Sequence, residues 1–233
     1  MRDVYGALLT RVQRAKRGDD RDGGWTLVEL IVSMTIFVGL LTIIFTMLIS
    51  YSTQTKDNIA RTRAVDQAQV GLMQIDRQVR SGNVISDPAT EATSGSGVPP
   101  YYALRVYTQT DGVYQCVQWR VRFPNTTPYG QLEFRSWQPG SVATATAWRV
   151  VAHNVVKPTG TFTASDPTTW PPFFVQATDA EASSQAQTIR LTLRLKDPSQ
   201  SAKSKPATVT STLTGRNTIY GYPSDSCGVT PAP

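Results

Sequence analysis

The longest apolar stretch of the chain runs from Leu30 to Ile49 and contains no charged side chain. The polar side chains within it are Ser33, Thr35, Thr42 and Thr46. At a helical rise of about 1.5 Å per residue, a run of this length covers about 30 Å, the thickness of the hydrocarbon core of a bilayer. A buried core helix is the alternative, but such helices are usually shorter and have a polar face. The pattern predicts one transmembrane helix.

A second apolar pattern, with helical spacing, follows between Gln54 and Ser81. Its apolar residues recur three and four positions apart, as on one face of a helix. They are Val65, Ala68, Leu72, Ile75 and Val79. No proline or glycine pair interrupts 25–81, so we expect one continuous helix, bent at most at Gly39 and Gly71. This stripe is typical of a helix that docks on a sheet and of a spine that continues a membrane span, and the two interpretations are compatible.

After Ser81-Gly82-Asn83, a typical helix end, the apolar pattern changes to a period of two. Apolar and polar residues alternate over 117–123 and 189–196, which indicates half-buried antiparallel strands. Weaker strand candidates are 101–108, 131–137, 147–152, 173–176 and 207–213. Segments rich in Pro, Thr, Ser and Gly are expected to be loops and a tail, at 87–100, 158–172 and 222–233.

These patterns predict an α+β fold, in which a long N-terminal transmembrane-plus-stalk helix packs on an antiparallel β-sheet head. The chain is expected to divide into a polar leader at 1–24, a membrane helix at 25–50, an amphipathic continuation at 51–82 and a β-rich head with a flexible C-terminal tail at 83–233. The boundary of the head lies near Gly82, although helix and sheet should share one core.

Charged residues near the apolar run indicate its orientation. Five basic residues lie in the twenty positions before Trp25, and Lys56, Arg61 and Arg63 follow the run. Because basic residues concentrate on the cytoplasmic side of membrane helices, we expect the N-terminus in the cytoplasm and the head exported. The net charge of +6 is too mild to indicate nucleic acid binding by itself.

The two cysteines, Cys116 and Cys227, both fall in the segment that we expect to be exported. An oxidising compartment favours a disulfide between them, and two free thiols are the alternative. If it forms, the bridge closes a loop of about 110 residues, for which chain entropy gives at most roughly 4 to 5 kcal/mol.

The polar leader ends at Asp22-Gly23-Gly24. A secretory signal peptide would be cut after its apolar run, next to small residues, and no such pattern follows Ile49. Gly23 and Gly24 lack side chains and leave accessible backbone that a protease can bind, while Trp25 begins the helix. A cut after Gly24 would remove the charged leader and create a new amine on Trp25.

The sequence Gly24-Trp25-Thr26-Leu27-Val28-Glu29, followed by the apolar run, resembles the prepilin family, which includes type IV pilins and the pseudopilins of type II secretion. The resemblance implies that a prepilin peptidase cuts after Gly24 and N-methylates Trp25. Family members usually carry Phe or Met at this place, so Trp25 departs from the pattern, which bears on methylation more than on cleavage. Members assemble through this helix into a pilus or pseudopilus.

Glu29 lies one turn into the apolar helix, where an unpaired carboxylate is costly. The resemblance implies that it pairs with the N-terminal amine of a neighbouring subunit and sets the stagger between helices in the filament. The alternative is a carboxylate that reaches the lipid headgroups and does nothing more. One subclass of tip pseudopilins lacks this acid, so its presence argues against that subclass.

The size of the head, and Gly215-Arg216-Asn217 after the last strand candidate, resemble more loosely the larger minor pilins and pseudopilins of the PilW or J-type group. This favours a minor subunit that primes or caps the tip over a major pilin. The implied partners are the prepilin peptidase, other pilin or pseudopilin subunits and the cytoplasmic membrane.

Other function classes have less support in the sequence. The exported part has one histidine, His153, and no metal-ligand cluster or nucleophile–base spacing, so we expect no catalytic, metal or cofactor site. A single-pass receptor with no filament role is an alternative, and it predicts that the leader is never removed.

A DNA- or surface-binding pilin is the other alternative, because basic residues fall on the polar faces of the predicted strands with aromatic residues nearby. They are Arg105, Arg120, Arg122, Arg190, Arg194 and Lys196, with Tyr101, Tyr102, Tyr107 and Trp137. Ordinary solvated strand faces explain the same pattern and are favoured.

Overall fold

The computed structural model describes residues 25–175, 188–215, 222–223 and 225–233. Its longest element is the helix α2 (Leu27–Arg80). The chain forms two compact units that divide within this helix, between Thr53 and Gln54. The first 27 residues of the helix therefore belong to one unit, and its remainder belongs to a second unit that contains the whole sheet.

The part of α2 before Gln54 exposes its apolar side chains. Among its exposed large apolar residues between Leu27 and Ile49, the exposed fraction runs from 46% for Leu30 to 76% for Leu27. Within the described chain, α2 is the one helix that is long and apolar enough to cross a membrane.

Hydroxyl groups in this apolar part bond within the helix. Ser33 donates to the carbonyl of Leu30, and Thr residues donate to carbonyls four positions earlier at 2.7–2.9 Å. The Thr donors are Thr35, Thr42, Thr46 and Thr53. Because each of these hydroxyls has a partner in its own helix, none of them needs water.

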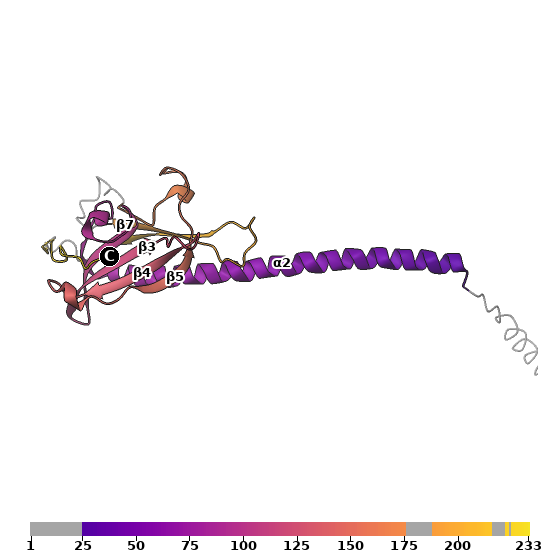
Figure 1. The fold of residues 1–233 in the computed structure, drawn as a ribbon, viewed down its shortest axis with the longest axis horizontal. Coiled ribbons are helices and arrows are strands. Elements are labelled where there is room, and N and C mark those ends of the chain that lie inside the picture. The colour runs from indigo at the N-terminus through magenta and orange to yellow at the C-terminus, as the bar shows by residue number, and fades with distance from the viewer. Residues whose placement is uncertain (1–24, 176–187, 216–221, 224) are drawn as a thin grey trace, which may run out of the picture. The chain divides into compact units, whose positions relative to one another are not determined.

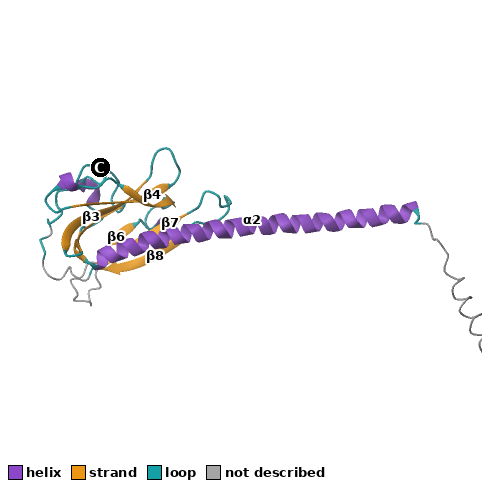
Figure 2. Cartoon of the chain, turned by 90° about the horizontal axis from the view of Figure 1, so that it is seen from below, coloured by secondary structure: helices purple, strands orange, loops and turns teal. Residues whose placement is uncertain are grey.

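The part of α2 after Thr53 packs on the sheet, as Figures 1 and 2 show. Its buried residues recur three and four positions apart: Ala60, Ala64, Ala68, Gly71, Ile75 and Val79. Val65 and Leu72 of the predicted stripe are only partly buried beside them. The observed stripe is thus rotated slightly toward small residues, which let the helix backbone approach the sheet closely.

Gly71 is a point of close approach between the helix and the sheet. A Cβ atom at this position would lie 2.8 Å from Cδ2 of Leu132, which is fully buried. The glycine therefore makes room for a strand side chain, whereas Gly39 has no atom within 4 Å of the equivalent position.

The sheet has eight antiparallel strands in the order β1-β2-β3-β4-β5-β7-β6, with β8 on β7. The strands are β1 (Gly82–Ile85), β2 (Ala103–Thr110), β3 (Val113–Arg122), β4 (Gly130–Trp137), β5 (Arg149–Val155), β6 (Phe173–Val175), β7 (Thr188–Leu195) and β8 (Ala207–Thr214). β7 pairs along its length with β8, while β5 and β6 share its other edge. The predicted α+β fold, a long N-terminal helix packed on an antiparallel sheet, is confirmed.

Strand β1 was not predicted. It follows directly after the helix end, and its pairing shifts by one residue between Gly82 and Val84. A strand of four residues with such an irregularity leaves too short an alternation to recognise. Short 3₁₀ helices at Glu91–Ser94, Val142–Thr144 and Pro167–Thr169 lie in connecting segments.

Candidate functional site

The first candidate site is the N-terminal end of α2. The amide of Glu29 donates to Oγ1 of Thr26 at 3.2 Å, and the amide of Leu30 donates to the carbonyl of Thr26 at 3.1 Å. Thr26 is therefore the N-cap of the helix, and it satisfies one of the backbone donors that a helix start leaves free. This cap was not predicted, although Thr followed three residues later by Glu is a recognised helix-start signal.

The structure describes two of the three residues predicted for this site, Trp25 and Glu29. Gly24 lies outside the described residues, while Trp25 precedes the helix and is 72% exposed. Glu29 lies in the first turn and is exposed. A carboxylate in this turn is stabilised by the helix dipole, so Glu29 has a local structural role whether or not it meets another subunit.

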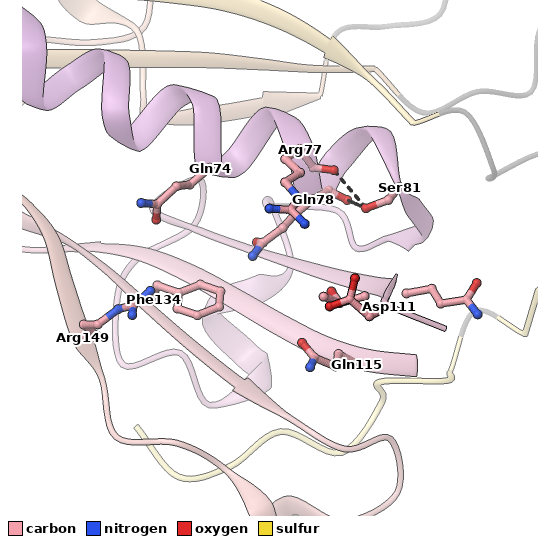
Figure 3. Close-up of a pocket in the computed structure, with 10 residues that line it drawn as sticks. Gln74, Arg77, Gln78, Ser81, Asp111, Gln115, Phe134 and Arg149 are labelled. Carbon is pink, nitrogen blue, oxygen red and sulfur yellow. Dashed lines mark hydrogen bonds between the residues drawn. The ribbon is translucent and has the colours of Figure 1, made fainter. Parts of the chain in front are cut away.

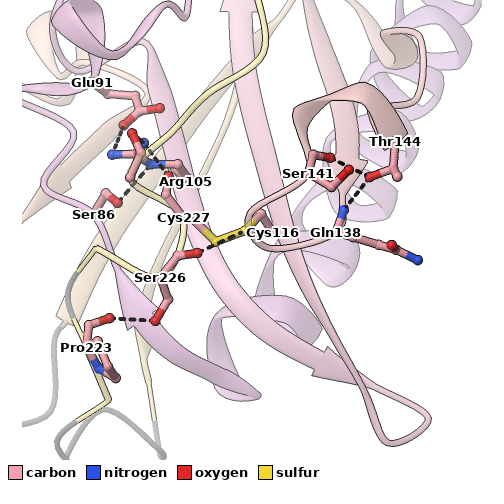
Figure 4. The surroundings of a disulfide bond; sticks show 11 residues. Ser86, Glu91, Arg105, Cys116, Gln138, Ser141, Thr144, Pro223, Ser226 and Cys227 are labelled. Atoms are coloured by element: carbon pink, nitrogen blue, oxygen red, sulfur yellow. Dashed lines mark hydrogen bonds and ion pairs between the residues drawn. A yellow bond between two sulfur atoms is a disulfide. The ribbon is translucent and has the colours of Figure 1, made fainter.

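The second candidate site is the disulfide region of the head. Cys116 on β3 and Cys227 form a disulfide across a sequence separation of 111 residues, with their Cα atoms 5.8 Å apart. Trp137 packs against the bridge. Figure 4 shows that Arg105, with its partners Ser86 and Glu91, lies beside the chain at Cys227.

The chain after the disulfide is bound to the sheet through arginine side chains. Arg135 donates to the carbonyls of Pro231 at 2.9 Å and Ala232 at 2.5 Å, and Arg105 donates to the carbonyl of Cys227 at 2.7 Å. A flexible tail was expected over 222–233, but residues 225–233 are bound to the sheet. We call residues 225–233 the C-terminal strap. Backbone carbonyls hold it in place, and composition gives no sign of these contacts.

The strap covers a face of the sheet that carries buried charges. The Nε atom of Arg120 lies 2.6 Å from Oε2 of Glu133, and both side chains are about 5% exposed. On the neighbouring strand positions, Arg135 donates to Oε1 of Gln118, and Gln118 donates to Oε1 of Glu91 at 2.5 Å. We call the set Glu91, Arg105, Gln118, Arg120, Glu133 and Arg135 the buried arginine layer.

Trp148 covers this layer from a loop before β5. Its ring lies 3.8 Å from the guanidinium carbon of Arg120 and 4.2 Å from that of Arg135. An aromatic face attracts a cation that has lost part of its water, so one tryptophan stabilises two neighbouring arginines.

Burial changes the ionisation of this layer. Desolvation raises the pKa of Glu91, and the charge of Arg105 and the hydrogen bond from Gln118 oppose this shift. Desolvation, with the charge of Arg120, lowers the pKa of Arg135 to about 10. Arg135 therefore stays cationic at neutral pH and remains a donor to the strap carbonyls.

These contacts correct the expectation of solvated basic strand faces. Arg105, Arg120 and Arg194 are 5–9% exposed, so neither a solvated face nor a DNA-binding surface describes them. Arg122 has a side chain that is 49% exposed. Arg190 stacks on Trp170, with 3.8 Å between its guanidinium carbon and the ring centroid. Alternation predicted the strands correctly, but it does not say which segments cover the polar face.

Comparisons of the chain with protein-family models, with curated proteins and with solved structures find no match. Among the described residues, no cluster of His, Cys, Asp or Glu could hold a metal ion. His153 is exposed, and its backbone amide bonds to Gln67 at 3.3 Å. The proposal below rests on the apolar part of α2 and its Thr26 cap.

Proposed function

We propose that this chain is a minor type IV pilin or pseudopilin subunit, which assembles through its N-terminal helix into a pilus or pseudopilus and primes or caps the tip. The observation that carries the proposal is the division of α2. Residues after Thr53 form part of the core of the head, while the large apolar residues before it lie exposed. Exposed apolar side chains along a helix of this length need a cover of lipid or of other subunits.

In this proposal the chain is first a single-pass protein of the cytoplasmic membrane, with its N-terminus in the cytoplasm. The prepilin peptidase cuts between Gly24 and Trp25 and methylates the new amine. The Thr26 cap keeps the helix ordered close to the new terminus. Glu29 then pairs with the terminal amine of a neighbouring subunit, because an ion pair removes the cost of a lone carboxylate in apolar surroundings.

The deciding experiment is the N-terminal mass of the full chain, expressed with and without a prepilin peptidase. The expected product with the peptidase begins at Trp25 and carries an added methyl group, and without the peptidase the leader remains. A leader that stays intact in both strains would contradict the proposal and favour a single-pass receptor instead.

A second experiment separates the charge of Glu29 from its place in the cap. Glu29→Gln removes the charge, whereas Thr26→Ala removes the hydroxyl that accepts from the Glu29 amide. We expect Glu29→Gln to be cut normally but to reduce co-isolation with other pilin subunits at least about tenfold, the effect of losing about 1.4 kcal/mol. Thr26→Ala should change co-isolation much less. Equal incorporation of Glu29→Gln and the unaltered chain would remove the proposed role of this carboxylate.

The described head gives no separate support to a DNA-binding pilin. Three of the arginines that suggested one are buried, and two of these contact the strap or Glu133. A basic surface for nucleic acid needs cations that can reach phosphates.

A further inference from the structure

The apolar layer between α2 and the sheet ends before the elements themselves do. On the face of β2 and β3 toward the helix, Val106 and Val117 are buried, but the next positions on that face are Thr108 and Gln115. At the end of the helix, polar Gln74, Gln78 and Ser81 lie next to the buried Ile75 and Val79. Polar walls cannot close on each other as an apolar core does, because their groups need hydrogen-bond partners.

A cavity of about 450 Å³ lies at this end of the head. It is bordered by the last turns of α2, the β2–β3 hairpin, β4 and β5, and Figure 3 shows its lining side chains. The volume is in the range of small-molecule sites, which run from about 300 to 1,000 Å³. Most such sites are mainly apolar, whereas this one is lined largely by amides and hydroxyls, so a matching ligand is itself polar.

Two arginines reach the cavity from different elements. Arg77 comes from α2 and Arg149 from β5, while Asp111 lies at the hairpin turn. The ion pairs between described residues include neither arginine. The lining thus has two cations and one anion, and a carboxylate or other planar anion is the natural partner of a guanidinium that lacks one.

An aromatic ring forms another part of the wall. Phe134 lies with its ring centroid 5.6 Å from the guanidinium carbon of Arg149 and 4.8 Å from the ring of Trp119. Trp119 in turn donates its indole N–H to Oε1 of Gln78 at 2.6 Å. A ligand between these walls would meet an aromatic side chain, amide groups and a guanidinium within one small volume.

We propose that this cavity binds an acidic saccharide of one or two rings. Amide and hydroxyl side chains match the hydroxyl groups of a sugar, because both donate and accept hydrogen bonds. Phe134 offers an apolar surface to the C–H face of a sugar ring. Arg77 and Arg149 bind the carboxylate, which distinguishes a uronic acid from a neutral sugar. The proposal does not depend on filament assembly, since all these residues belong to the head.

The indole N–H of Trp119 provides the test, because it donates to a side chain of the cavity wall. The full chain, labelled with ¹⁵N-tryptophan and held in detergent micelles, is titrated with glucuronic acid, and the Trp119 indole resonance is followed by NMR. We expect a saturable shift with glucuronic acid. Glucose should bind at least about fivefold more weakly, and acetate should give no saturable shift.

Arginine variants test which charges matter. Arg149→Gln and Arg77→Gln are expected to weaken glucuronic acid binding by about five- to tenfold each. Arg122→Gln removes the same charge from a half-exposed arginine that lies outside the cavity lining, and it should leave binding unchanged. Trp137 packs against the disulfide and lies outside the cavity lining, so an unchanged Trp137 indole resonance in the free variants shows that the head is folded.

Three outcomes would overturn the proposal. No saturable shift with glucuronic acid would exclude the ligand class, and equal binding of glucose would remove the role of the arginines. Tighter binding of triglutamate than of glucuronic acid would assign the cavity to acidic peptides instead. None of these outcomes changes the N-terminal mass, so failure here is distinct from failure of the proposed subunit function.

Discussion

The two faces of the sheet are both buried, but they exclude water in different ways. On β3 the residues from Cys116 to Val121 are all buried, and they point alternately to the two faces. The face toward α2 carries Val117, Trp119 and Val121 and packs against the helix. The opposite face belongs to the buried arginine layer, and loops and the C-terminal strap cover it.

This difference shows that the apolar face and the charged face depend on different kinds of contact. The apolar face is stabilised by removal of apolar surface from water and by close packing. The charged face is stable only while every cation keeps its carboxylate, carbonyl or ring partner, because an unpaired buried charge is costly. Substitutions on the two faces should therefore lower the free energy of unfolding for different physical reasons.

The largest effect is expected on the charged face. Arg120→Met leaves Glu133 buried without its closest cation, so we expect the free energy of unfolding to fall by about 3–5 kcal/mol. Denaturant unfolding of the full chain in detergent, followed by near-UV circular dichroism, measures it. Arg122→Met is the control, because Arg122 is half exposed and lies 3.6 Å from the same carboxylate; its cost should stay below about 1 kcal/mol. Equal costs for the two variants would show that burial does not set the value of this pair.

The next effect concerns the cover of the charged face. Replacing both Cys116 and Cys227 by Ser removes the tie between β3 and the strap, and we expect the free energy of unfolding to fall by about 2–4 kcal/mol. Hydrogen exchange should become faster across the strap before it changes in the helix stripe. If strap amides exchange at the same rate with and without the bridge, the arginine–carbonyl contacts alone hold the strap.

A smaller effect is expected on the apolar face. Gly71→Ala places a Cβ atom 2.8 Å from Cδ2 of Leu132, and the crowding should reduce the free energy of unfolding by about 1–3 kcal/mol. Gly39→Ala in the same helix meets no atom within 4 Å, so it should cause no loss of head stability. Unfolding of the two variants side by side tests this, and a loss with Gly39→Ala as large as that with Gly71→Ala would refute the steric explanation.

The smallest effect depends on pH. Burial raises the pKa of Glu91 above its ordinary value of 4.5, so the folded chain binds this proton more tightly than the unfolded chain does. Stability from this group is fully present below the ordinary pKa and is lost as the pH rises through the folded pKa. Glu91→Gln keeps an oxygen that can accept from Gln118. We expect the melting temperature of the unaltered chain, relative to this variant, to fall as pH rises from about 4 to about 7. A rise would mean that the arginines outweigh burial.

Sequence patterns predicted the long helix and seven of the eight strands because apolar residues on the helix-facing side recur with a clear period. Ala64 and Gly71 were not predicted to belong to the buried stripe of the helix. Small residues indicate close packing only when the partner surface is known. Strand β1 escaped prediction because four residues after a helix end show no period.

The functional features divide in the same manner. The cap at the start of α2 was not predicted, but Thr26 and Glu29 carry a sequence signal for it, because a cap is a local arrangement of neighbouring residues. The buried arginine layer has no such signal, because its partners lie far away in the chain: Arg135 binds carbonyls at 231 and 232, and Arg120 pairs with Glu133. The cavity beside Phe134 also depends on four separate elements, so no single stretch of sequence indicates it.

The hydroxyl groups of α2 before Gln54 affect the cost of moving this segment from one apolar medium to another. Five of these hydroxyls donate to carbonyls of their own helix, those of Ser33, Thr35, Thr42, Thr46 and Thr53. Moving the segment from one apolar medium to another therefore breaks none of these bonds. In the assembly proposed above, passing from lipid into a bundle of helices would therefore cost little for these hydroxyls, and the direction would be set by shape and by Glu29 near the capped end.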